Sequence, residues 1–142
     1  MRIKSNAFLT IWCLLLGSLL GTVSARAQGV TRLVDTTTIA LKSGESTDVF
    51  DLYAVVSCRS VLKSPIEVEI LDGPPQVSAA VKEAMVLPRG QNCSKSVKGG
   101  TFVLSANEIE DPSFSRLTVR FLFKTRDGDR KISEVLNLQL LP

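Results

Sequence analysis

Few residues in this chain have the type and spacing that chemistry requires. The sequence has no histidine, so the commonest general base is missing and lysine or a carboxylate would have to replace it. Ser60-Val61-Leu62-Lys63 has a spacing at which a lysine can activate a serine nucleophile. In enzymes that use a serine–lysine pair at this spacing, Lys-Thr-Gly and Ser-Asp-Asn patterns accompany it, and neither pattern occurs here. We therefore predict a protein with no catalytic residues and no cofactor, which is not an enzyme.

Two groups of carboxylates are candidates for binding calcium. Glu108, Glu110 and Asp111 lie close together, and Asp127 and Asp129 flank a glycine. Hard oxygen ligands of this kind suit calcium. The same residues are also typical of loops and hairpin turns, and the spacing does not match an EF-hand loop. We predict that the chain holds no metal.

The cysteines indicate the compartment. Cys13 lies in the N-terminal apolar segment, which leaves Cys58 and Cys93, 35 positions apart, in the rest of the chain. A redox pair is usually Cys-x-x-Cys, and a zinc site needs four ligands, so neither fits. Two cysteines in an exported chain are most simply joined. We predict a Cys58–Cys93 disulfide.

The N-terminus has the three parts of a secretory signal. Arg2 and Lys4 precede an apolar run over residues 8–20, and Ala25-Arg26-Ala27 supplies the small residues of a cleavage site. An uncleaved anchor is the alternative, but glycine and serine interrupt the run, and a spanning helix needs about 20 apolar residues. We predict a signal peptide at 1–27, cleavage between Ala27 and Gln28, no membrane span after cleavage, and one domain at 28–142.

Cleavage changes the charge balance. The whole chain has 17 Lys and Arg against 14 Asp and Glu. Removal of the three basic residues Arg2, Lys4 and Arg26, with no acidic residue, leaves 14 against 14 and a net charge of zero. Nucleic-acid binding requires a basic patch on the folded domain. We therefore predict no nucleic-acid partner.

The elements that would hold these residues are short strands. Runs rich in β-branched and aromatic residues alternate with turns of Gly, Pro, Asn and Asp, which is typical of a sandwich or barrel. Residues 77–87 fit a short helix or an irregular strand equally well. Gly99-Gly100 indicates a bulge or a close approach of backbones. The runs are 30–41, 47–58, 66–71, 97–105, 117–124 and 132–140. The run at 47–58 is nearly continuously apolar, so we expect it to be a central strand.

The last two runs predict a hairpin. With a two-residue Asp127-Gly128 turn, Phe123 lies opposite Ile132 and the apolar residues of both strands share one face. Glu134 then lies opposite Phe121 on that apolar face, a placement for which the pattern offers no account.

About seven strands with polar turns predict an all-β fold, an antiparallel β-sandwich of immunoglobulin-like architecture that could include one short helix.

These features favour three functions in order. The first is a non-enzymatic binding or structural module of the bacterial cell envelope, periplasmic or secreted, whose partner is a protein or another envelope component. The second is an assembly subunit that exchanges strands, since residues 28–41 alternate and could add to another chain. The third is a small secreted hydrolase or inhibitor. The oligomeric state and the ligand do not follow from the sequence.

Overall fold

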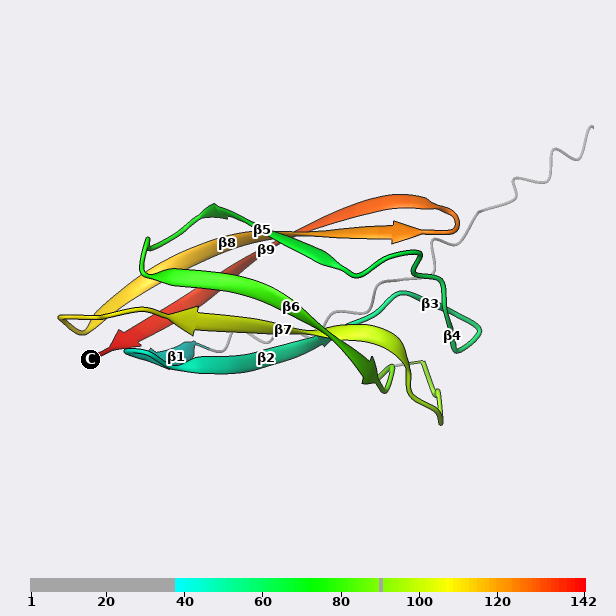
Figure 1. Cartoon of the computed structure of the whole chain (residues 1–142), viewed down its shortest axis with the longest axis horizontal. Helices are drawn as coiled ribbons and strands as arrows, with labels where there is room; N and C mark the ends of the chain where they lie inside the picture. Colours follow the sequence, from blue (N-terminus) through cyan, green and yellow to red (C-terminus); the bar gives the residue numbers. More distant parts are fainter. Residues whose placement is uncertain (1–37, 90) are drawn as a thin grey trace, which may run out of the picture.

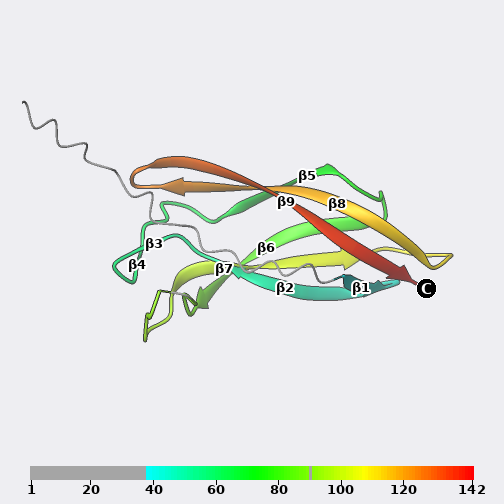
Figure 2. The same ribbon diagram turned by 180° about the vertical axis from the view of Figure 1, so that it is seen from behind.

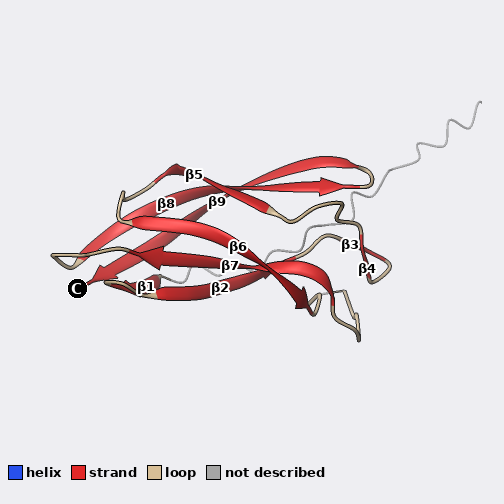
Figure 3. Cartoon of the chain, in the orientation of Figure 1, coloured by secondary structure: helices blue, strands red, loops and turns tan. Residues whose placement is uncertain are grey.

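Two β-sheets face each other across an apolar core (Figure 1). The computed structural model of the chain describes residues 38–89 and 91–142. These residues form strands, turns and loops, and no helix occurs among them (Figure 3). The all-β prediction is confirmed, and the optional short helix is absent from the described part of the chain. The predicted cleavage site at Ala27 and Gln28 lies outside the described residues.

The strands divide into two main sheets and one small ribbon. One sheet has four strands in the order β1-β9-β8-β5, the opposing sheet has three in the order β2-β7-β6, and β3 pairs with β4. Nine strands are assigned among the described residues: β1 Ile39–Lys42, β2 Ser46–Leu52, β3 Val55–Val56, β4 Arg59–Ser60, β5 Glu67–Asp72, β6 Val77–Val86, β7 Val97–Ala106, β8 Ser113–Thr125 and β9 Gly128–Leu141.

The four-stranded sheet is mixed, so the prediction of a wholly antiparallel sandwich is wrong. β1 runs parallel to the C-terminal end of β9, with Ile39 paired to Leu138 and Leu41 to Leu140 (Figure 2). A parallel pairing is possible because β1 and β9 are far apart in the sequence, so no tight turn joins them. The backbone N–H of Ser43 donates to Leu141 at 2.8 Å and closes this end.

Residues 77–86 form a strand, which settles the ambiguous segment. All ten residues of β6 pair with β7 in one unbroken register, from Val77 opposite Ala106 to Val86 opposite Val97. Val77 and Val81 contact the core between the sheets, whereas Val86 belongs to a separate cluster on the outer face. The buried face changes along β6, so its apolar residues do not alternate strictly as in a regular strand. Their spacing is close to that of an amphipathic helix, and for this reason the sequence fitted a helix and a strand equally well.

The run at 47–58 is not a central strand, contrary to prediction. β2 is the end strand of its sheet and pairs only with β7 among the described strands. The centre of this sheet is β7, whose Phe102 and Leu104 are fully buried. The apolar run is long because the chain leaves β2 at Leu52 and passes beneath a loop, where Tyr53 and Val55 are buried in a second cluster.

The hairpin of β8 and β9 forms, with a register two residues away from the predicted one. Thr125 pairs with Gly128 and Phe121 with Ile132, so Arg126 and Asp127 are the turn residues. Gly128 has a φ of 116° and follows the turn as its left-handed residue. A shift of two residues keeps the same side chains on the same face, so alternation alone could not distinguish the two registers.

The core between the sheets is built around three phenylalanines. The ring centroid of Phe102 lies 5.1 Å from that of Phe50 and 4.9 Å from that of Phe121, and these rings join the two sheets. Glu134 faces the same interior with 2% of its surface exposed. It pairs with Val119 rather than with Phe121 as predicted, because of the register shift.

Candidate functional site

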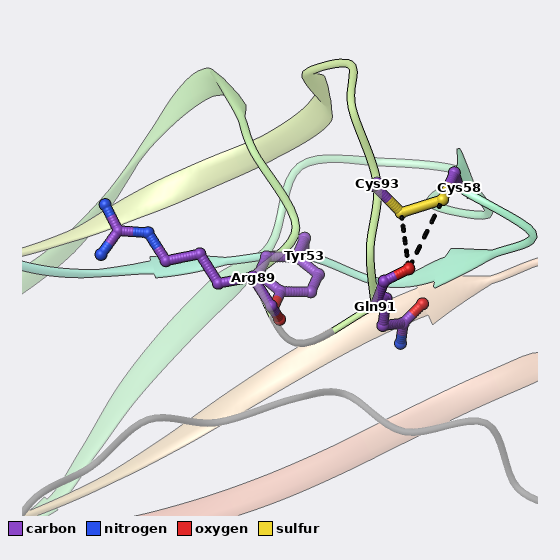
Figure 4. The surroundings of a disulfide bond; sticks show 5 residues. All are labelled: Tyr53, Cys58, Arg89, Gln91 and Cys93. Atoms are coloured by element: carbon purple, nitrogen blue, oxygen red, sulfur yellow. Dashed lines mark hydrogen bonds between the residues drawn. A yellow bond between two sulfur atoms is a disulfide. The ribbon is translucent and has the colours of Figure 1, made fainter.

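The predicted Cys58–Cys93 disulfide is present at one end of the sandwich (Figure 4). Cys58 belongs to the two-residue turn between β3 and β4, where Ser57 and Cys58 have φ values of 49° and 58°. Two consecutive left-handed residues define a type I′ hairpin turn. Cys93 lies in the loop between β6 and β7, and the two Cα atoms are 5.5 Å apart. The bond therefore ties the tip of a small hairpin to a long loop.

The β6–β7 loop lies over the outer face of the three-stranded sheet, where it covers a small apolar cluster. Tyr53, Val55, Val86 and Val97 form this cluster, and all are at least nine-tenths buried. The hydroxyl of Tyr53 donates a hydrogen bond to the backbone carbonyl of Arg89 at 2.6 Å. The loop is thus held both by the disulfide and by the tyrosine beneath it.

A carbonyl oxygen packs against the disulfide itself. The backbone carbonyl oxygen of Gln91 is 3.6 Å from Sγ of Cys93 and 3.9 Å from Sγ of Cys58 (Figure 4). Because sulfurs in a disulfide carry no hydrogen, these are close contacts; only a reduced thiol could donate to the oxygen.

An open cavity of about 430 Å³ lies between the edge strand β2 and this loop. Its walls come from β2, from the start of the β6–β7 loop and from β7. The lining residues are Asp48, Val49, Phe50, Asp51, Tyr53, Leu87, Arg89 and Thr101. We call it the β2 cavity.

A β-bulge shapes the β2 cavity. Asp48 pairs with Val103 and Phe50 with Phe102, so Val49 is the extra residue of the bulge. A regular strand would turn every second side chain away from the cavity. Because of the bulge, Asp48 and Asp51 pair with Val103 and Thr101 and share one face of the sheet, whereas Val49 and Phe50, which also border the cavity, pack against the core between the sheets.

The charged groups of the β2 cavity are the carboxylates of Asp48 and Asp51 and the guanidinium of Arg89. Asp51 accepts a hydrogen bond at Oδ1 from the hydroxyl of Thr101, 3.1 Å away, which orients the carboxylate. Oδ1 of Asp48 lies 4.0 Å from Nζ of Lys82, and both side chains are more than half exposed. The side chain of Arg89 extends away from the disulfide (Figure 4).

The predicted calcium candidates are not gathered into a metal site. Glu108, Glu110 and Asp111 line a second open cavity of about 510 Å³ beside Gln76 and Leu140. Within residues 38–89 and 91–142, no group of three or more His, Cys, Asp or Glu side chains is arranged to hold a metal ion. Asp129 of the other candidate pair lies opposite Lys124 in the β8–β9 hairpin.

Ser60 and Lys63 attach β4 and the segment that follows it to neighbouring strands. The Ser60 hydroxyl donates to the backbone carbonyl of Lys98 in β7 at 2.8 Å. The backbone N–H of Lys63 donates to the carbonyl of Lys124 at 2.8 Å. Among the described residues no hydrogen bond joins the two side chains, so the structure does not pair them as nucleophile and base.

Sequence reasoning did not find the β2 cavity, although the sequence carried one signal for it. Val49 and Phe50 are adjacent apolar residues between Asp48 and Asp51, which breaks the alternation of a regular strand and is typical of a bulge. No pattern indicated that Leu87, Arg89 and Thr101 would complete the cavity, because the fold brings them there.

Comparisons with known proteins do not place the chain in a class. No protein-family model and no curated protein sequence matches it. Among solved structures, the chain is weakly similar to the solution structure of amebosin, with a TM-score of 0.37, 8% sequence identity, and coverage of 74% of this chain and 87% of that one. No helix among the described residues is long and apolar enough to span a membrane.

Proposed function

We propose that the protein is an exported, non-enzymatic binding or structural module of the bacterial cell envelope, located in the periplasm or secreted. The observation that carries this proposal is the position of the Cys58–Cys93 bond. The bond lies outside the core and holds the loop that forms one wall of the β2 cavity. Disulfides form and persist in oxidising compartments, so this wall would be stable where an exported protein works.

Export is tested by expressing the full chain, with its own N-terminus, in a bacterial host. We expect the purified protein to begin at Gln28 and to lack free thiols, as shown by N-terminal sequencing and by the intact mass before and after alkylation. A chain that keeps residues 1–27, or that has two alkylated cysteines without prior reduction, would contradict the proposal.

The non-enzymatic part is tested on the same purified protein. We expect no turnover of ester or peptide substrates, because the Ser60 hydroxyl already donates to the Lys98 carbonyl. Substrate turnover that disappears in Ser60→Ala and persists in a control Ser64→Ala variant would identify a hydrolase.

We further propose that the sandwich is immunoglobulin-like. The support is the division of the strands, with β2, β7 and β6 in one sheet and β9, β8 and β5, joined by a parallel β1, in the other. Immunoglobulin domains distribute their strands between two sheets in a comparable way. An experimental structure of the mature chain with another strand order would refute it.

A strand-exchanging assembly subunit is the second candidate, favoured by the short β1. β1 pairs with only the last residues of β9, from Leu138 to Leu141, although β9 begins at Gly128. A strand from another copy could add along this edge. If the mature protein stays monomeric at all concentrations, and removal of residues 28–35 changes only its stability, this candidate fails.

A further inference from the structure

The β2 cavity combines an excess of negative charge with apolar side chains. Asp48 and Asp51 supply two carboxylates against the single guanidinium of Arg89, and Leu87 supplies an exposed apolar side chain near the buried ring of Tyr53. Lysine and arginine side chains match such a surface, because their methylene stems pack on apolar groups while their charged ends pair with carboxylates.

The two carboxylates have the spacing of a β-strand. Asp48 pairs with Val103 and Asp51 with Thr101, so they lie opposite residues two positions apart on β7. Residues two positions apart in a strand point to the same face at a distance of about 6.8 Å. An adjacent extended chain that carries Lys or Arg at every second position would therefore place a cation beside each carboxylate.

The backbone of β2 favours a peptide over a small molecule. β2 is the end strand of its sheet, and its second edge is not paired with any of the described strands. Extended peptides bind such edges through main-chain hydrogen bonds, and side chains at alternate positions give specificity.

We propose that the β2 cavity binds an extended segment of a partner protein in which basic and apolar residues alternate. This inference rests on the proposed binding function and specifies its ligand. The existing ion pair does not prevent such binding: Lys82 reaches Asp48 only at 4.0 Å and both side chains are largely exposed, so the pair contributes little.

The disulfide contributes by fixing the loop wall. Leu87 and Arg89 lie at the start of the loop that contains Cys93, and Tyr53 hydrogen-bonds to the Arg89 carbonyl within the cavity wall. If the loop were released, the apolar wall would move while the carboxylates of β2 would remain.

The test is an NMR titration of the isotope-labelled mature chain, residues 28–142. The probes are the capped pentapeptides Val-Lys-Val-Lys-Val, Val-Gln-Val-Gln-Val and Val-Glu-Val-Glu-Val. We expect the basic peptide to shift the amide signals of β2 and of the loop at Leu87 and Arg89, and to bind about fivefold more tightly than the others, since it alone forms two ion pairs with the exposed carboxylates. Equal binding of all three peptides, or shifts confined to other strands, would overturn the proposal.

Variants locate the binding site. The double variant Asp48→Asn with Asp51→Asn should weaken binding of the basic peptide by about fivefold. The control Asp72→Asn removes an exposed carboxylate on β5 of the other sheet and should leave binding unchanged. Unchanged binding in the double variant, with its amide spectrum otherwise intact, would refute the assignment. If the peptide fails to bind although Gln28 is the N-terminus and the disulfide is formed, the ligand class is wrong and the export proposal stands.

Discussion

Removal of the Cys58–Cys93 bond is expected to lower the free energy of unfolding by about 4 kcal/mol. The bond closes a loop of 35 residues, and in the chain-entropy model the lost restriction of the unfolded chain has this magnitude. A domain of this size is stable by about 5 to 15 kcal/mol, so the Cys58→Ala and Cys93→Ala double variant should fold with a much smaller margin.

The backbone conformation at the turn lowers the stability of the fold, which is opposite to the stabilising effect of the disulfide. Ser57 and Cys58 both have positive φ, which costs a residue with a side chain about 1 kcal/mol and costs glycine almost nothing. The matched variant Cys58→Gly with Cys93→Ala removes the same bond but relieves this strain. It should therefore be more stable than the alanine pair by about 1 kcal/mol.

Urea denaturation of the three proteins measures both contributions. Tyr53 is the single tyrosine of the chain and is buried beneath the loop, so its near-ultraviolet circular dichroism reports on the loop, while the far-ultraviolet signal reports on the sheets. Equal unfolding midpoints for the wild type and the alanine pair would refute the loop-closure reasoning. A glycine variant less stable than the alanine variant would refute the strain reasoning.

Three further outcomes are expected. Gly99→Ala should destabilise the fold by about 2 kcal/mol in urea, because the new Cβ would lie 2.5 Å from the Leu52 carbonyl oxygen and 2.6 Å from a Val86 methyl carbon. Tyr53→Phe should cost about 1 kcal/mol through the lost hydrogen bond and should accelerate amide exchange in the β6–β7 loop. The hydrogen bond from Lys124 to Glu67 raises the lysine pKa, so this pair stabilises the fold below the usual lysine pKa, and its contribution disappears as pH rises through the raised value. The thermal midpoint of Lys124→Met should therefore lie slightly below that of the wild type at neutral pH and match it in strong alkali.

The sequence predicted those features that depend on local pattern or on composition. The all-β class followed from alternation and turn residues, and the disulfide followed from two cysteines in a chain with a signal-like N-terminus. Gly99 and Gly100 correctly indicated a close approach, because an added Cβ at either position would collide with a neighbouring strand. The β8–β9 hairpin was predicted, but its register was not, since registers that differ by two residues bury the same face.

The features that were missed depend on contacts between distant segments. No single run of residues shows that β2 lies at the edge of its sheet, or that the β6–β7 loop lies next to it. The type I′ turn at Ser57 and Cys58 contains no glycine or asparagine, the residues that usually indicate such a turn in a sequence. The small β3–β4 hairpin supports this turn through the Val55 pairing with Ser60, and the Cys58 bond to Cys93 holds it from outside.

The core between the sheets and the disulfide stabilise different parts of the molecule. The core contains Phe102 and Phe121 from opposite sheets and is filled without any contribution from the cysteines. The disulfide instead secures a loop over the cluster at Tyr53, on the outer face of one sheet. A bond that served only global stability could join any two strands across the core. A bond placed here also holds the loop whose Leu87 and Arg89 line the β2 cavity, and on this ground we propose a binding function at this end of the molecule.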